Sequence, residues 1–223
     1  RLLNGMTYPE EIRPLMWLST FPPDKSSPLS SEALEQRQEG AALAPTDDHL
    51  RRVSDRSVDD KVIYLYVKHY LQDDILVKVD RASMATSLEV RAPFLDVNVV
   101  EFLCALPARY KLRGLTRKYL LRRLMRDRLP PGIADRPKKG FGIPLAKWFR
   151  SEMRELLLEV LDPQRLEREG IFNPAYVGRL VQDHLAGRRD YRKELWTLTV
   201  FRLWKERWLG TTTPSPAMEE CRG

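Results

Sequence analysis

The segment from Arg136 to Gly142, with the sequence RPKKGFG, combines residue types that suit an anionic ligand. Arg136, Lys138 and Lys139 supply three positive charges, and the two glycines let the backbone come close to a bound group. A lysine beside a leaving phosphate neutralises the negative charge that develops as the bond breaks. We therefore interpret the segment as a phosphate- or pyrophosphate-binding loop, with a solvent-exposed basic turn as the alternative.

A second group of ionisable residues precedes this loop in the chain. If residues 73–87 form a helix, Asp74, Lys78 and Arg81 recur at i, i+4 and i+7 and share one face, whereas Asp80 belongs to another. The pattern fits a charged helix that faces a ligand. It fits equally well a helix whose surface carries i,i+4 salt bridges.

Glu89 and Arg91 flank Val90 just before a Pro-Phe-Leu turn. Their position beside this rigid turn predicts that both side chains are partly enclosed. Because enclosed charges are costly unless they are paired, such a pair either fixes a scaffold or faces a ligand.

The positive charge of the chain is concentrated around the RPKKGFG segment. The net charge is +7, and residues 108–150 hold fourteen lysines and arginines against two aspartates, so this window carries +12 and the remainder −5. A strong local positive field attracts an anion such as a nucleotide phosphate, a nucleic acid or an anionic membrane surface. Aromatic residues are too few in the window, and too irregularly spaced, for a platform that stacks single strands. Nucleic acid is therefore a disfavoured partner.

The composition argues against several other classes of protein. Two cysteines, Cys104 and Cys221, are too few for a disulfide scaffold, and three scattered histidines form no zinc motif, so no metal ligands are predicted. No apolar run approaches the roughly 18 residues of a membrane-spanning helix, and no signal-peptide pattern is found, so we expect no membrane association and a cytoplasmic location. Because the first residue is Arg1 and not Met, we expect the sequence to be part of a longer protein.

Helical periodicity predicts the elements that must position these side chains. Ser57 is predicted to cap a helix that runs to about Tyr70, and a second helix is expected from Asp73 to about Ser87. The last predicted helix is apolar nearly all round, which indicates burial on most sides. Further helices, the first of them capped by Asp96, are expected at residues 97–105, 116–128, 145–160, 175–186 and 192–208.

Other stretches are predicted to lack regular structure. The segment 19–56 begins with a stretch rich in proline and serine that buries too little apolar surface to offset its ordering entropy, so it is expected to be a flexible insertion or loop. The tail 210–223 is expected to be disordered for the same reason, and residues 132–143 to form an irregular loop. Since no parallel-strand pattern and no internal repeat is found, the fold class is predicted to be mainly α.

Four blocks of the sequence together resemble the glutamine-hydrolysing asparagine synthetase family. The blocks are HYLQDDILVKVDRASMATSLEVRAPFLD, KLRGLTRKYLLRR, LPPGIADRPKKGFGIPLAKWFR and ELWTLTVFRLWKERW. They occur in the family's order from about Val58 to Trp208. The resemblance implies the helical C-terminal portion of an α/β adenine-nucleotide alpha-hydrolase-like (PP-loop ATP pyrophosphatase) synthetase domain.

The sequence departs from the family in what it does not contain. The family's Ser-Gly-Gly-x-Asp-Ser pyrophosphate loop, its acidic Gly-rich segment and its glutaminase domain with a cysteine nucleophile do not occur in these 223 residues. We therefore expect the sheet-bearing half of the synthetase domain to be absent from this chain, and the chain alone to be inactive. On this basis the expected segments are an upstream remnant (1–18), the flexible insertion (19–56), the C-terminal helical domain (57–209) and the tail (210–223).

The resemblance also implies a reaction in two steps. ATP, with Mg²⁺ on its phosphates, adenylates the side-chain carboxylate of aspartate, and pyrophosphate leaves. Ammonia derived from glutamine then attacks the acyl-adenylate to give asparagine. The implied partners are these small molecules and the glutaminase and nucleotide-binding halves of the enzyme, and a homodimer remains open.

Site residues follow from the resemblance position by position. Lys138 matches the lysine that stabilises pyrophosphate and the transition state, with Lys139 as the alternative, and Arg136 is expected to anchor their loop. The charged helix beside the aspartate-binding end is matched by Asp74, Lys78, Asp80 and Arg81. The turn that shapes the same pocket is matched by Glu89 and Arg91.

Two other functions stay open at this point. A related amidotransferase or cyclase of a specialised pathway would reuse the same blocks. A helical anion-binding or nucleic-acid-binding module would explain the basic window, but it would not explain the ordered blocks outside that window.

Overall fold

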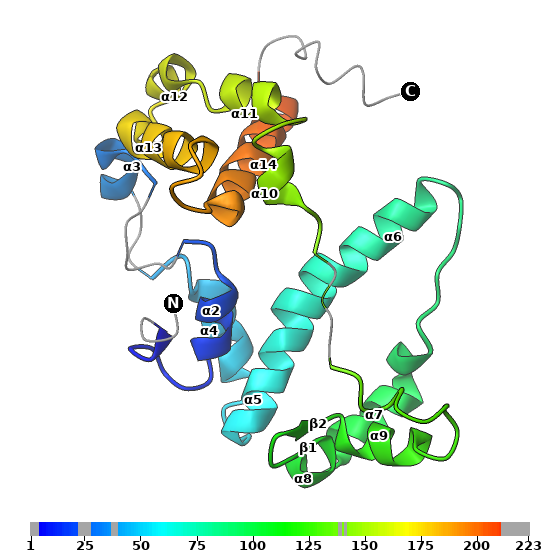
Figure 1. The fold of residues 1–223 in the computed structure, drawn as a ribbon. Coiled ribbons are helices and arrows are strands. Elements are labelled where there is room, and N and C mark those ends of the chain that lie inside the picture. Colours follow the sequence, from blue (N-terminus) through cyan, green and yellow to red (C-terminus); the bar gives the residue numbers. More distant parts are fainter. Residues whose placement is uncertain (1–4, 22–27, 37–39, 138–139, 141, 211–223) are drawn as a thin grey trace. The chain divides into compact units, whose positions relative to one another are not determined.

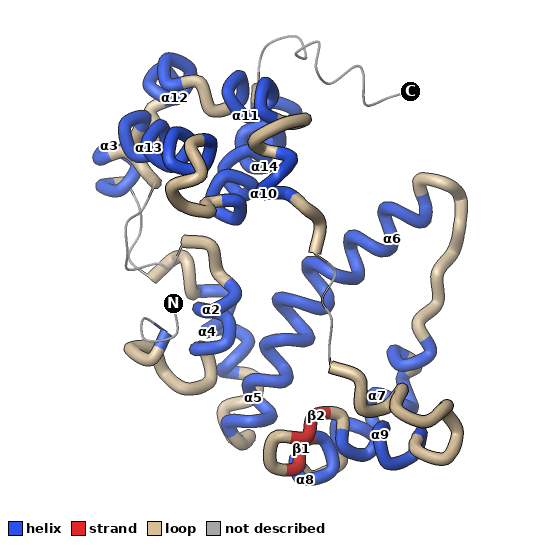
Figure 2. Tube along the Cα trace, in the orientation of Figure 1, coloured by secondary structure: helices blue, strands red, loops and turns tan. Residues whose placement is uncertain are grey.

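The computed structural model describes residues 5–21, 28–36, 40–137, 140 and 142–210 (Figure 1). The chain divides into two compact units, each built from two stretches. Unit 1 comprises Arg1–Trp17 and Pro45–Gly140, and unit 2 comprises Leu18–Ala44 and Phe141–Gly223. Helices dominate the described residues, as Figure 2 shows, so the prediction of a mainly α protein is confirmed. None of the helices in these residues is long and apolar enough to cross a membrane.

One continuous helical rod organises unit 1 (Figure 1). It runs through α5 (Val58–Leu65), the π-helical η1 (Tyr66–Leu76) and α6 (Val77–Met84). The predicted cap is confirmed, because Ser57 Oγ accepts the N–H of Asp60 at 3.2 Å. The predicted division into two helices is wrong, since no glycine or proline interrupts the stretch and the residues at both junctions keep helical backbone angles.

Beyond α6 the chain turns through a left-handed residue, Ser87, with a φ of 57°. The short 3₁₀ helix η2 (Pro93–Leu95) follows, and then α7 (Val97–Ala105). Asp96 Oδ1 accepts the N–H groups of Asn98 and Val99 at 3.0 and 3.4 Å, so the predicted cap of this helix is confirmed.

A small hairpin replaces the start of the helix predicted at residues 116–128. After α8 (Ala108–Lys111), β1 (Leu112–Arg113) pairs antiparallel with β2 (Thr116–Arg117), and only then does α9 (Tyr119–Met125) begin. The connecting turn starts at Gly114, whose φ of 57° suits a two-residue hairpin turn. The prediction therefore missed a turn that a single glycine permits.

The loop that follows α9 has no helix or strand in its described part, residues 132–137, 140, 142 and 143. The expectation of an irregular loop is confirmed for these residues. Lys138 and Lys139 lie outside the described residues, and so does the predicted disordered tail from residue 211 onward.

The segment 19–56 is not a featureless loop. It contains α3 (Ser31–Glu35) and α4 (Ala44–Arg51), while α2 (Arg13–Leu18) precedes it. Leu29 forms a β-bridge with Phe172, and the N–H of Ser30 donates to the carbonyl of Ile171 at 2.9 Å. Composition predicted flexibility because it reflects only the segment itself. The residues that hold the segment in place lie some 140 positions away along the chain. The predicted division of the chain into four segments itself stays a prediction.

Unit 2 also contains five helices from the C-terminal part of the chain. They are α10 (Leu145–Trp148), α11 (Arg154–Val160), α12 (Pro163–Glu169), α13 (Pro174–Leu185) and α14 (Arg192–Leu209). Asp162 and Asn173 cap α12 and α13, and a proline follows each cap at the first helical position. The single helix predicted for residues 145–160 is wrong, because the non-helical backbone of Met153 separates α10 from α11.

These helices enclose a core of twelve buried apolar residues. The core residues are Leu145, Phe149, Leu157, Val160, Leu161, Leu166, Phe172, Val177, Leu180, Val181, Leu195 and Leu198. Helix α14 buries only one face, and Trp204 and Trp208 remain 49% and 66% exposed. The prediction that α14 is buried on most sides is therefore wrong.

His184 is the most enclosed polar side chain of this core, with no exposed surface. Its Nδ1 accepts the N–H of Tyr191 at 3.1 Å, and its Nε2 lies 3.3 Å from the carbonyl oxygen of Ala146, to which the neutral ring donates. The ring thus joins α13 to α10 and to the start of α14. Burial lowers the pKa of His184 below its ordinary value of 6.5, despite the carbonyl of Ala146.

We predict that unit 2 loses stability as the pH falls below about 6.5. The folded unit binds a proton on His184 more weakly than the unfolded chain does, so the contribution of this ring is complete above that pH and declines below it. Substitution of Ala for His184 should cost about 2–4 kcal/mol at pH 7.5, because it leaves a cavity and two unpaired backbone groups. Urea unfolding followed by tryptophan fluorescence measures both effects. An equal acid dependence in the His184→Ala variant would contradict the assignment.

Candidate functional site

The predicted charged helix is present in unit 1, and its side chains are exposed. Asp74 lies in η1, whereas Lys78, Asp80 and Arg81 lie in α6. Within the part of the chain that the structure describes, none of the four takes part in an ion pair. The alternative of i,i+4 salt bridges is therefore wrong for the described residues, and the helix presents charges of both signs.

Glu89 and Arg91 form a pair, but they are not enclosed. Arg91 Nε donates to Glu89 Oε1 at 2.8 Å, and the two side chains are 86% and 69% exposed. The predicted partial enclosure is wrong, because residues 85–92 form an exposed loop after α6. A surface pair of this kind contributes about 0–1 kcal/mol to stability.

A basic groove brings Arg136 together with three cations that the sequence analysis did not select. The groove has a volume of about 420 Å³, and its cationic lining residues are Arg117, Lys118, Arg122 and Arg136. The rest of the lining is apolar and consists of Phe94, Leu121, Met125, Leu129 and Ala134. Residues from β2, α9 and the following loop therefore meet at one anion-attracting surface.

An ion pair beside the basic groove links α9 to the loop that carries the predicted lysines. Arg122 Nη1 lies 3.6 Å from Asp135 Oδ1, beside Arg136. Lys118 has a left-handed backbone with a φ of 54°, immediately before the first turn of α9. The loop continues from Arg136 and Pro137 to Lys138 and Lys139, which lie outside the described residues.

Tyr119 accepts hydrogen bonds from two neighbouring arginines that do not line the basic groove. Arg113 Nη1 donates to the hydroxyl of Tyr119 at 2.6 Å, and Arg123 Nη1 lies 3.5 Å from the same oxygen. These hydrogen bonds, that from Arg113 first, lower the pKa of Tyr119.

These basic residues belong to the charged window 108–150, but their pattern in the sequence pointed to no individual role. The i,i+4 spacing of Lys118 and Arg122 was the available signal, because it places two cations one turn apart. What the spacing could not show is that Arg136 meets the same surface.

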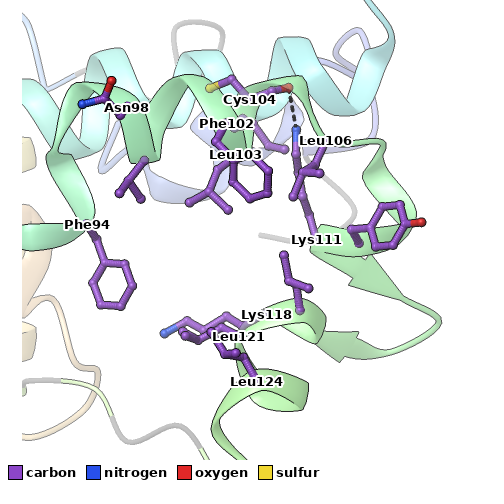
Figure 3. A pocket seen from close by; sticks show the side chains of 14 residues that line it. Phe94, Asn98, Phe102, Leu103, Cys104, Leu106, Lys111, Lys118, Leu121 and Leu124 are labelled. Carbon is purple, nitrogen blue, oxygen red and sulfur yellow. Dashed lines mark hydrogen bonds between the residues drawn. The ribbon is translucent and has the colours of Figure 1, made fainter.

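An apolar pocket of about 820 Å³ adjoins the basic groove and shares three lining residues with it: Phe94, Lys118 and Leu121. Figure 3 shows α7 on one side and α9 on the other, with Phe102 and Leu103 pointing inward. At its edge Lys111 Nζ donates to the carbonyl of Cys104 at 3.3 Å. No carboxylate or imidazole lines this pocket, and apolar side chains dominate its lining, so it is better suited to packing than to chemistry.

Among the described residues, no three histidine, cysteine, aspartate or glutamate side chains gather closely enough to hold a metal ion.

Comparison with known proteins bears out the resemblance. Asparagine synthetase (glutamine-hydrolysing) 1 of Bacillus subtilis is 32% identical over 71% of this chain and 25% of its own length. A protein of Mycobacterium tuberculosis named as a putative glutamine-hydrolysing asparagine synthetase is 38% identical over 60% of the chain and 21% of its own. The asparagine synthetase of Gallus gallus is 30% identical over 77% of this chain and 30% of its own length.

The chain thus spans roughly a quarter of the length of these relatives. No solved structure matches it significantly. The asparagine synthase family profile matches residues 8–206, which begins well before the first recognised block and includes the segment 19–56. Since this match covers most of the 223 residues, the chain belongs to the asparagine synthase family.

Proposed function

We propose that this chain is the helical C-terminal part of the synthetase domain of an ATP-dependent asparagine synthetase. The reaction would convert aspartate, ATP and glutamine-derived ammonia into asparagine, AMP and pyrophosphate through a β-aspartyl-adenylate. Family membership supports an amide-forming ligase, and the names of the relatives support asparagine as the product. The fold proposed for the whole domain is the PP-loop ATP pyrophosphatase type.

The observation that carries the proposal is the basic groove. Four cations around one concave surface suit a polyphosphate, because each positive charge offsets the repulsion between neighbouring phosphate oxygens. Arg117, Arg122 and Arg136 supply planar guanidinium groups that can hold two oxygens at once. We assign the groove to the phosphate end of ATP, whose Mg²⁺ would bind through the phosphates.

ATP supplies the activated phosphoanhydride that turns a carboxylate into an acyl-adenylate. The role proposed for Lys138 is to stabilise the pyrophosphate as it departs, since its charge grows in the transition state. The ion pair between Arg122 and Asp135 fits this role, because it ties the root of the loop to α9.

The aspartate end is proposed to lie along the exposed charges of α6 and the following turn. An aspartate substrate carries two carboxylates and one ammonium group. The carboxylates would be attracted by the basic side chains of Lys78, Arg81 and Arg91. The ammonium would be attracted by the acidic side chains of Asp74, Asp80 and Glu89. A cyclase or another amidotransferase with a different acceptor would use the same phosphate end, so the acceptor carboxylate distinguishes these alternatives.

Binding of inorganic pyrophosphate to the purified chain tests the basic groove directly. We expect binding at low ionic strength that weakens as salt is added, because the interaction is electrostatic. Lys118→Ala and Arg122→Ala should each raise the Kd about tenfold, which is the scale of one charge-assisted hydrogen bond. Arg179→Ala, an exposed arginine of α13 in unit 2, is the matched control and should change nothing. The affinity is measured by calorimetry. If Lys118→Ala and Arg122→Ala bind pyrophosphate as tightly as the Arg179→Ala control, the basic groove is not the phosphate site.

The isolated 223-residue chain should not catalyse adenylation. Backbone amides of a glycine-rich loop are a main binding element for a triphosphate, and the family's pyrophosphate loop does not occur in this sequence. Aspartate-dependent exchange of labelled pyrophosphate into ATP is therefore expected at background. Clear exchange that requires aspartate would overturn this expectation.

Within an intact enzyme that contains this chain, Lys138→Ala should lower kcat for adenylation by about 10²-fold. The KM for ATP should change far less, because the ammonium stabilises the transition state more than bound ATP. Hydrolysis of glutamine should survive and serves as the control for folding. If instead Lys139→Ala abolishes adenylation and Lys138→Ala does not, the role belongs to Lys139.

A further inference from the structure

Two histidines join α4 to the long helical rod of unit 1. The rings of His49 in α4 and His69 in η1 lie edge to face, with their centroids 5.2 Å apart and their planes at 79°. Tyr64 of α5 makes a similar contact with His49 at 5.7 Å. Thr46 Oγ1, one turn before His49, lies 3.2 Å from Nε2 of His69. Four side chains from three consecutive elements thus meet where α4 contacts the rod.

This cluster lies at the best-buried part of unit 1. Among the described residues of this unit, the only buried side chains are those of Ile12, Met16, Thr46 and Leu65, and Leu65 directly follows Tyr64. Nδ1 of His49 is itself buried and has no hydrogen-bond partner among the described residues. The contact between α4 and the rod therefore shields this ring nitrogen from water.

The surroundings of His69 favour its neutral form, although one nearby anion opposes this. From η1, Asp73 acts on His69 as an opposing anion, while Lys68 lies 6.0 Å from the Tyr64 ring and donates to Gln72. On α4, Asp48 is occupied by an ion pair with Arg51 at 2.6 Å, and Asp47 is exposed. Burial first, and His49 second, lower the pKa of His69, and Asp73 offsets this only in part.

We propose that His49 and His69 form a pH-sensitive latch that holds α4 on the rod when the ring of His69 is neutral and releases α4 when that ring is protonated. An imidazolium at His69 would place a positive charge about 5 Å from the His49 ring at a partly buried contact, where water screens charge less than in bulk solvent. Because His69 in the docked state binds a proton more weakly than free histidine, docking is complete above about pH 6.5 and weakens as the pH falls.

The latch acts on the element that the proposed function uses. The rod held by α4 at His69 carries Asp74 within the next two turns and Lys78 beyond it. Helix α4 is also where the chain re-enters unit 1, at Pro45. Release of α4 would therefore free one side of the rod without touching its charged residues. This inference goes beyond the proposed function and does not depend on it.

Hydrogen exchange of the full chain tests the latch. Between pH 7.5 and 5.5, and after correction for the intrinsic exchange rate, the protection of residues 46–51 should fall at least tenfold. Helix α13 provides a reference within the same sample for global unfolding. In the His49→Gln, His69→Gln double variant the fall should be absent. An unchanged α4 in the wild type, or an equal fall in the double variant, would overturn the proposal.

Asp73→Asn provides a second variant that keeps both rings and replaces an exposed side chain. Removal of the anion that faces His69 should move the midpoint of α4 release to lower pH. The chain has only three histidines, so a histidine NMR titration can follow His69 directly, with His184 in unit 2 as a separate signal. Release of α4 that does not coincide with the titration of His69, or a midpoint that Asp73→Asn leaves unmoved, would count against the latch.

Discussion

Unequal burial of apolar surface is the constraint on which the rest of this structure depends. The twelve-residue core belongs entirely to unit 2, whereas the described part of unit 1 buries only three apolar side chains, Ile12, Met16 and Leu65. Burial of apolar area is the main favourable term in folding, so unit 2 has the means to hold its helices in one arrangement. Unit 1 carries all the candidate site residues on a long helix, a small hairpin and exposed loops. Its side chains are correspondingly available for ligands.

Within each unit, single polar contacts fix a geometry that apolar packing alone would not specify. In unit 2, His184 connects three helices through two backbone hydrogen bonds, and the segment at Leu29 and Ser30 attaches to Ile171 and Phe172. In unit 1, the cluster of Thr46, His49, Tyr64 and His69 has the corresponding role. Each of these contacts satisfies or shields polar atoms inside the protein, which makes it costly to break.

The candidate site illustrates how a weak local signal becomes a specific surface. Arg136 alone is one cation in an irregular loop. Beside Arg117, Lys118 and Arg122 it lines a concave surface suited to several phosphate oxygens. The apolar pocket next to it is larger, but its lining is mostly apolar and contains no carboxylate or imidazole. Chemistry in this unit is therefore expected at the smaller, charged groove and along the charged face of the rod.

The sequence by itself determined what depends on neighbouring residues. The caps at Ser57 and Asp96, the mainly helical content, the extent of α13 and α14 and the family all followed from local patterns and ordered motifs. Only the tertiary structure decided the continuity of the rod, the exposure of Glu89 and Arg91, the docking of residues 28–31 and the assembly of the basic groove. These features depend on contacts and burial between residues that are distant along the chain, and such contacts leave no periodic signature in the sequence.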